Sequence, residues 1–202
     1  YSVCSLAGLI ISLGIGFLIY FILSSINAQS SWLDYNTIVA NASHNLFYKL
    51  IWYIMNFTEA QFYAGVFASL GVILGGFVAW RLDVKNSKLA GFNVSYGSNL
   101  WPWVLASQLL SLFIAIFVLN FTSFFENGEY TWLPTFITVV GAPPAIMLLY
   151  GPSIKALLTG SILGGVMGFP VAFWITNNII PVLGVPGVVS NVFTMAITGI
   201  LV

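Results

Sequence analysis

The chain has 202 residues, of which 59% are apolar and only 5% are charged, and its formal net charge is zero. A soluble domain usually carries about 25% charged residues, so a soluble fold of this size could not bury so much apolar surface. The balanced charge also gives no electrostatic reason to bind nucleic acid. We therefore predict an all-α, polytopic integral membrane bundle whose first partner is the lipid bilayer.

Long apolar runs predict about six membrane segments, because a helix needs roughly 20 apolar residues to cross a bilayer. The segments are expected at residues 3–23, 60–80, 100–119, 133–150, 153–175 and 188–202. Together they predict a single transmembrane domain over residues 1–202. The missing initiator methionine and the short final run indicate a longer chain trimmed at one or both ends.

A short apolar and aromatic run at residues 46–56 cannot cross a bilayer by itself. Helical spacing divides it into an apolar face and a more polar aromatic face, formed by Phe47, Leu50, Ile51 and Ile54 and by Tyr48, Lys49, Trp52 and Tyr53. This pattern is typical of a helix at the membrane interface, where Trp and Tyr collect. A tilted first turn of the next segment fits it equally well.

Most basic residues occupy two loops on one side of the predicted bundle. Arg81, Lys85 and Lys88 follow the second segment, and Lys155 lies between the fourth and fifth. The positive-inside rule places that side in the cytoplasm. We therefore expect a plasma (inner) membrane protein with a cytoplasmic N-terminus and an outward-facing loop at Glu126.

Four glycosylation sequons begin at Asn41, Asn56, Asn93 and Asn120. A modified asparagine must face outwards and stand clear of the bilayer. Under the predicted topology only Asn41 meets both conditions, so we interpret most of the others as chance occurrences.

Glycines recur every four residues on two segments. Gly160, Gly164 and Gly168 share one helical face, and Gly71 and Gly75 repeat the spacing on the second segment. Small residues let helix backbones approach closely, and close packing is the main attraction between helices in lipid. These faces predict tight helix packing; smooth faces that slide or line a substrate path are the alternative.

Prolines predict broken or re-entrant helices in the C-terminal half. Pro143 and Pro144 remove two backbone donors in the middle of a segment. Pro181, Pro186 and Gly187 interrupt the chain a second time before the last segment. Lipid cannot pair the freed carbonyls, so these breaks must be buried in protein or border a polar cavity. An ordinary kink and an ordinary outer loop are the alternative.

The two breaks define the candidate substrate site, a polar cavity shared between them. Broken helices build the binding sites of many transporters, and amides and hydroxyls bind neutral solutes without burying a charge. The residues proposed to line it are Pro143, Pro144, Phe173, Trp174, Asn177, Asn178, Ser190 and Asn191. The alternative for Asn177 and Asn178 is that they cap the fifth segment.

Signals for catalysis are nearly absent. His44 is the only histidine, and no His, Cys or carboxylate cluster has metal-ligand spacing, so we predict no enzyme activity, cofactor or metal. The leading function is a transporter or permease, or its membrane subunit, for a small and mostly uncharged solute. The runner-up is a scaffold that packs against other membrane subunits, or a second copy, through the glycine faces. An intramembrane enzyme is third.

Overall fold

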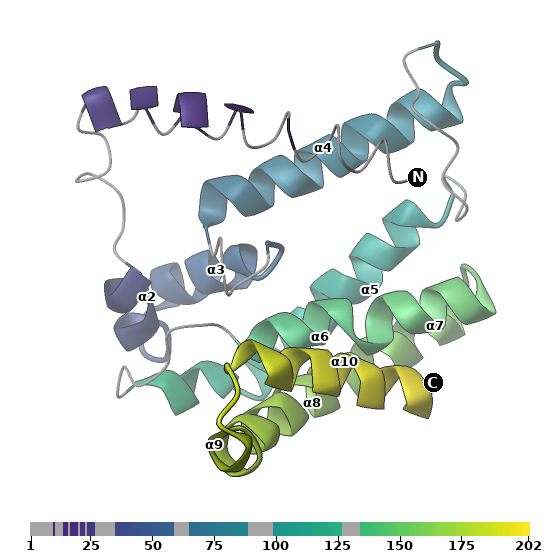
Figure 1. Ribbon diagram of the computed structural model, residues 1–202. Coiled ribbons are helices and arrows are strands. Elements are labelled where there is room, and N and C mark those ends of the chain that lie inside the picture. Colours follow the sequence, from purple (N-terminus) through teal and green to yellow (C-terminus); the bar gives the residue numbers. More distant parts are fainter. Residues whose placement is uncertain are drawn as a thin grey trace. The chain divides into compact units, whose positions relative to one another are not determined.

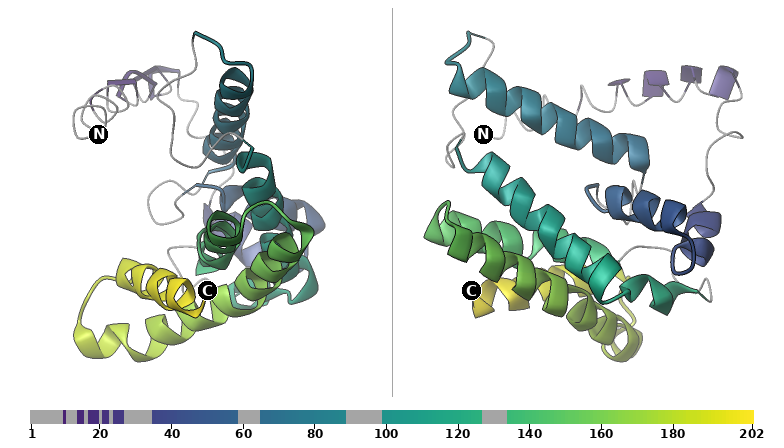
Figure 2. Two further views of the ribbon diagram at one scale, coloured as in Figure 1. Left: turned by 90° about the vertical axis from the view of Figure 1, so that its right-hand side faces the viewer. Right: turned by 180° about the vertical axis from the view of Figure 1, so that it is seen from behind.

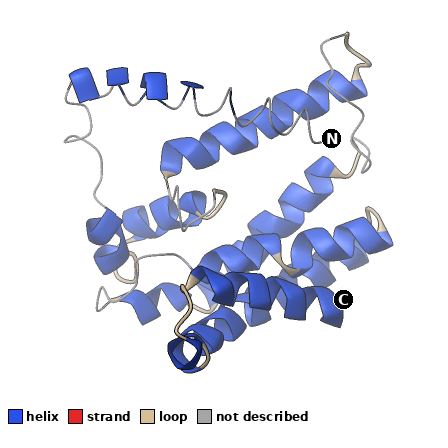
Figure 3. Ribbon diagram, viewed as in Figure 1, coloured by secondary structure: helices blue, strands red, loops and turns tan. Residues whose placement is uncertain are grey.

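The computed structural model describes residues 10, 14–15, 17–19, 21–22, 24–26, 35–58, 65–88, 99–126 and 134–202. The chain divides into two compact units, residues 1–37 and 38–202. Within the described ranges all regular structure is helical and there is no strand (Figure 3), which confirms the all-α class. Most of the first predicted segment, residues 3–23, lies outside the described residues.

The described elements after residue 34 follow one another along the chain, with α2 beginning in the first unit. They are α2 (Tyr35–Asn41), α3 (Leu46–Met55), α4 (Val66–Val84), α5 (Trp101–Phe113), the π-helical η2 (Ile114–Val118), the short 3-10 helices η3 (Phe121–Phe125) and η4 (Pro134–Phe136), α6 (Ile137–Val140), α7 (Ala142–Tyr150), α8 (Ile154–Asn178), α9 (Ile180–Leu183) and α10 (Val188–Leu201).

Three helical stretches in the described ranges are long and apolar enough to cross a membrane. They are Val66–Val84, Trp101–Val118 and Ile154–Leu183. Shorter apolar helices cover Leu46–Met55, Pro134–Tyr150 and Val189–Leu201. The structure thus supports a helical membrane protein, whereas the count of six segments stays a prediction.

Helix α8 is the centre of the second unit, and α5, α6, α7 and α10 pack against it (Figures 1 and 2). Its first turn is capped by Ser153, whose hydroxyl accepts a hydrogen bond from the Ala156 amide at 3.2 Å. Glycines lie where α7 comes closest. A Cβ added to Gly160 would lie 3.2 Å from Pro143 Cα, and one added to Gly164 would lie 2.7 Å from Pro143 Cδ.

The helix pair α5 and α8 is equally close. A Cβ on Gly165 would lie 2.7 Å from the Ser111 carbonyl oxygen. One turn away, the hydroxyl of Ser161 donates to the Ser107 carbonyl at 3.0 Å, and the two hydroxyls lie 3.3 Å apart. Small residues therefore bring these backbones within hydrogen-bonding range of each other's side chains.

A break separates α6 from α7 at Gly141, whose φ of −81° and ψ of −113° are not helical. Pro143 and Pro144 fall in the first turn of α7, where the backbone N–H groups lack helical acceptors and their absence costs little. The prolines therefore start a new helix; they do not bend a continuous one. Two carbonyls before the break accept instead from α5: Gln108 Nε2 donates to Val139 O at 3.0 Å, and Ser111 Oγ donates to Thr138 O at 2.7 Å.

The second interruption lies between α8 and α10. The short α9 carries Pro181 in its first turn and ends at Gly184, which has a φ of +62°. This left-handed conformation suits glycine and stops the helix. After a short turn, Gly187 leads into α10.

Helix α3 buries residues from both of its predicted faces. Trp52 and Asn56 are fully buried, and Thr135 joins them: Trp52 Nε1 donates to Thr135 Oγ1 at 3.0 Å, and Thr135 Oγ1 donates to Asn56 Oδ1 at 2.8 Å. Phe47 and Leu50, from the apolar face, are exposed. Ile51, from the apolar face, is buried as well, so the buried side of α3 takes residues from both predicted faces, and the Asn56 sequon is inaccessible.

Polar groups of α3 also bind α5 and the chain beyond it. The Tyr53 hydroxyl donates to the Leu109 carbonyl at 2.7 Å, and burial raises the pKa of Tyr53 to about 12, so the phenol stays protonated. Lys49 Nζ donates to Asn120 Oδ1 at 2.6 Å. Because α3 ends at Met55 and α4 begins at Val66, α3 is a helix in its own right and not the first turn of the next segment.

The glycines of α4 lie in open surroundings, unlike those of α8. A Cβ at Gly71 or Gly75 would meet nothing within 4 Å, and only 6% of the apolar window of α4 is buried. Packing at this face of α4 therefore stays a prediction.

This contrast predicts opposite effects for the same substitution. Gly164→Ala should destabilise the protein by about 1–3 kcal/mol, because its methyl group collides with Pro143 and Ser111. Gly71→Ala should leave stability unchanged or raise it by up to about 1 kcal/mol, because alanine favours the helix. Thermal unfolding in detergent measures both. Equal melting temperatures for the two variants would show that α8 is not packed as described.

Candidate functional site

A polar stripe runs along the buried side of α10. Ser190, Asn191, Thr194 and Thr198 recur at helical spacing and are all buried. Helix α10 packs against α8, α6 and α7, so these side chains lie inside the bundle. Ser190 and Asn191 were predicted from the sequence as site residues, whereas Thr194 and Thr198 were not, although the four-residue spacing of the hydroxyls could have indicated them.

The hydroxyls of this stripe are paired. Thr194 Oγ1 donates to the Ser190 carbonyl at 2.7 Å, and Thr198 Oγ1 donates to the Thr194 carbonyl at 2.8 Å. Ser190 Oγ donates to the Gly187 carbonyl at 2.7 Å and accepts from Thr176 Oγ1 at 2.9 Å. Each hydroxyl therefore donates its proton to a backbone carbonyl of α10 or of its N-cap, and Ser190 also accepts a hydrogen bond from α8.

Asn191 is the exception. Its side chain is 1% exposed, and neither Oδ1 nor Nδ2 has a hydrogen-bond partner in the part of the chain that the structure describes. Leaving a buried amide unpaired costs about 1–3 kcal/mol, and a surrounding bilayer offers no water to reduce that cost. The amide therefore offers one free acceptor and two free donors inside the bundle.

The stripe extends to the α6–α7 break through Thr198. A Cβ on Gly141 would lie 3.0 Å from Thr198 Oγ1, and Thr198 stands about two helical turns from Asn191. Pro143 faces the glycines of α8. The structure thus brings α10 to the break, with Thr198 as the side chain in contact.

The other candidate residues are at the surface or in an aromatic cluster. Asn177, Asn178 and Trp174 are exposed at the end of α8, and Asn178 Nδ2 donates to the Trp174 carbonyl at 2.8 Å. This geometry corresponds to the alternative in which Asn178 caps α8. Phe173 packs on Phe169, with 5.3 Å between ring centroids.

The buried polar groups are uniformly neutral. Across the described ranges every buried polar residue is a serine, threonine or asparagine: Asn56, Thr58, Ser69, Ser107, Ser111, Thr122, Thr135, Thr138, Ser161, Ser190, Asn191, Thr194 and Thr198. Within the same ranges no group of three or more His, Cys, Asp or Glu residues could hold a metal ion. The interior formed by the described residues therefore offers hydrogen bonds and no formally charged side chain.

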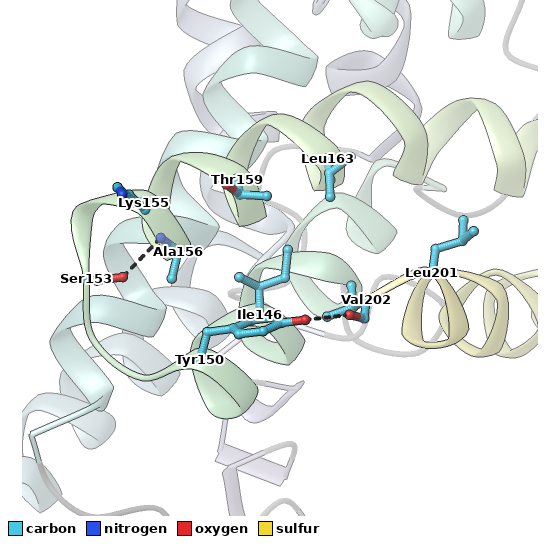
Figure 4. Close-up of a pocket in the computed structure, with 9 residues that line it drawn as sticks. All are labelled: Ile146, Tyr150, Ser153, Lys155, Ala156, Thr159, Leu163, Leu201 and Val202. Carbon is cyan, nitrogen blue, oxygen red and sulfur yellow. Dashed lines mark hydrogen bonds between the residues drawn. The ribbon is translucent and has the colours of Figure 1, made fainter.

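A separate cavity of about 380 Å³ lies between α7, the first turns of α8 and the end of α10 (Figure 4). Its lining includes Lys155 and Tyr150 and none of the residues predicted from the sequence to line a substrate site.

Comparisons with protein-family models, curated proteins and solved structures found no match.

The unpaired amide of Asn191 allows a prediction about stability. Asn191→Leu keeps the number and branching of the side-chain heavy atoms and removes the unsatisfied groups, so it should raise the free energy of unfolding by about 1–3 kcal/mol. Asn178→Leu is the matched control: its exposed amide makes one local bond, and its effect should stay within about 0.5 kcal/mol. Thermal unfolding in detergent tests both. A clear loss of stability in Asn191→Leu would reveal that the amide has a structural partner.

Proposed function

We propose that the protein is a transporter or permease, or the membrane subunit of one, for a small, mostly uncharged polar solute. The unpaired amide of buried Asn191 carries this proposal. A solute with one donor and one acceptor would pair both ends of that amide. Such pairing gives a reason for an amide that costs stability in the absence of a ligand.

The character of the interior supports a neutral solute. All buried polar side chains in the described ranges are neutral, and a charged solute there would lack a counter-charge against its desolvation cost. The Thr138 and Val139 carbonyls near the break already accept hydrogen bonds from α5. Asn191, on the same buried stripe of α10 as Ser190 and Thr198, is therefore a better binding element than Pro143 and Pro144 themselves.

A scaffold role is the second candidate, and the open face of α4 favours it. Gly71 and Gly75 have nothing within 4 Å in their surroundings, and α4 is long, apolar and little buried. Such a face can take the helix of another membrane subunit or of a second copy. The two roles are compatible in a membrane subunit of a larger transporter.

We further propose six membrane segments, re-entrant structure between α8 and α10, a location in the plasma (inner) membrane and a cytoplasmic N-terminus. Contact between two loops supports one common side for them: His44 Nε2 lies 3.4 Å from Glu126 Oε1, and the loop with Asn41 and His44 was predicted to face outwards like that of Glu126. The positive-inside rule places Arg81, Lys85, Lys88 and Lys155 in the cytoplasm.

Cysteine labelling tests this orientation. In a background with Cys4→Ser, Lys88→Cys should react with a membrane-impermeant maleimide only after the cells are opened. Glu126→Cys should react in intact cells. The reverse pattern would invert the topology, and labelling of both from outside would rule out the assignment of these loops to opposite sides.

A ligand screen tests transport. Purified protein is melted with neutral polar compounds, such as sugars, polyols and amides, and with charged ones as a comparison. We expect at least one neutral compound to stabilise the wild type and Asn178→Leu, by about 2.7 kcal/mol at a hundredfold excess over its Kd, and to leave Asn191→Leu unchanged. The same compound should enter proteoliposomes. An equal shift in Asn191→Leu would exclude the amide as the binding group.

A further inference from the structure

The C-terminal part of the chain carries a single charged side chain. Lys155 is the only Lys, Arg, Asp or Glu between Tyr130 and Val202. It lies in the first turn of α8 and lines the 380 Å³ cavity against α7 and α10. It forms no ion pair with any residue of the described ranges, and no carboxylate side chain lines the cavity.

The cavity has a polar end and an apolar end. Its polar side chains are Tyr150, Ser153, Lys155 and Thr159, and its apolar ones are Ile146, Ala156, Leu163, Leu201 and Val202. Figure 4 shows Ser153 and Lys155 beside the α7–α8 connection, with Leu163 and Leu201 at the opposite end. Along α8 the eight residue steps from Lys155 to Leu163 span about 12 Å.

The polar end offers donors for an anion. The Lys155 ammonium carries three N–H groups. Ser153 Oγ accepts from the Ala156 amide at 3.2 Å, so its own proton is free to be donated outwards. Tyr150 donates its proton to the Val202 backbone oxygen at 3.0 Å (Figure 4), which ties α7 to α10 and closes one wall of the cavity.

We infer that this cavity binds one anionic phospholipid, with the phosphate at Lys155 and Ser153 and an acyl chain along Leu163 and Leu201. Basic pockets between membrane helices on the cytoplasmic side are suited to anionic headgroups, and a lysine near a helix end places its ammonium at headgroup level. Charge complementarity selects an anionic lipid, and the apolar end distinguishes a lipid from a soluble anion. The inference is independent of the solute proposed for Asn191.

Lipid titration of the purified full chain in detergent tests this. The probes are short-chain phosphatidylglycerol, phosphatidylcholine of the same chain length, and inorganic phosphate, with melting temperature and native mass spectrometry as readouts. Phosphatidylglycerol should stabilise the wild type and Lys155→Arg, and its binding should weaken roughly fivefold in Lys155→Gln. Lys88→Gln, an exposed lysine outside the cavity, is the matched control and should bind like the wild type.

Two further results would support the apolar half of the site: weaker binding of phosphatidylglycerol by Leu201→Ser, and no stabilisation by inorganic phosphate. Three results would overturn the inference. They are equal weakening in Lys88→Gln, which indicates diffuse surface charge; equal binding of phosphatidylcholine; and a full shift with inorganic phosphate alone, which indicates a site for a soluble anion.

Discussion

The close approach of α5 and α7 to α8 is the contact on which the rest of the second unit depends. It requires glycine at positions 160, 164 and 165, because a Cβ at Gly164 would stand 2.5 Å from Ser111 Oγ and one at Gly165 would stand 2.7 Å from the Ser111 carbonyl. With no side chain there, Ser111 can sit between α8 and α6. From that position its hydroxyl donates to the Thr138 carbonyl, so the close packing of α5 on α8 also makes this hydrogen bond possible.

The break at Gly141 follows from this arrangement. A chain that stops one helix and starts another inside a bilayer must pair the carbonyls that lose their helical donors. Pro143 has no N–H for the Val139 carbonyl, and Gln108 of α5 replaces it at 3.0 Å. Because α5 satisfies the break from inside the protein, the broken helix is stable without a ligand. On α10, by contrast, the amide of Asn191 has no hydrogen-bond partner in the described part of the chain.

The sequence predicted the helical class, the buried glycine face of α8 and the interruption near Pro143, because composition, spacing and proline chemistry act locally. It did not predict which residues of α3 are buried, and these come from both faces. In lipid, apolar side chains are as stable outside as inside, so the pattern that separates Trp52 from Leu50 shows two faces without showing which one meets protein. The hydrogen bonds of Gln108 and Ser111 could not be predicted for another reason. Their partners are backbone carbonyls on a different helix, and no spacing along the chain reveals them.

Three asparagines show why the candidate site reduces to one residue. Asn56 and Asn178 each donate to the carbonyl four residues earlier, at 2.7 and 2.8 Å. For Asn191 that carbonyl belongs to Gly187, which already accepts from the Ser190 N–H at 3.0 Å and the Ser190 hydroxyl at 2.7 Å. A carbonyl oxygen has two lone pairs, so the preceding serine occupies the acceptor that would otherwise satisfy the amide. The amide of Asn191 is thus unpaired because Ser190, its neighbour in the first turn of α10, occupies the Gly187 carbonyl. Burial of the Asn191 side chain keeps the amide away from any other partner in the described part of the chain.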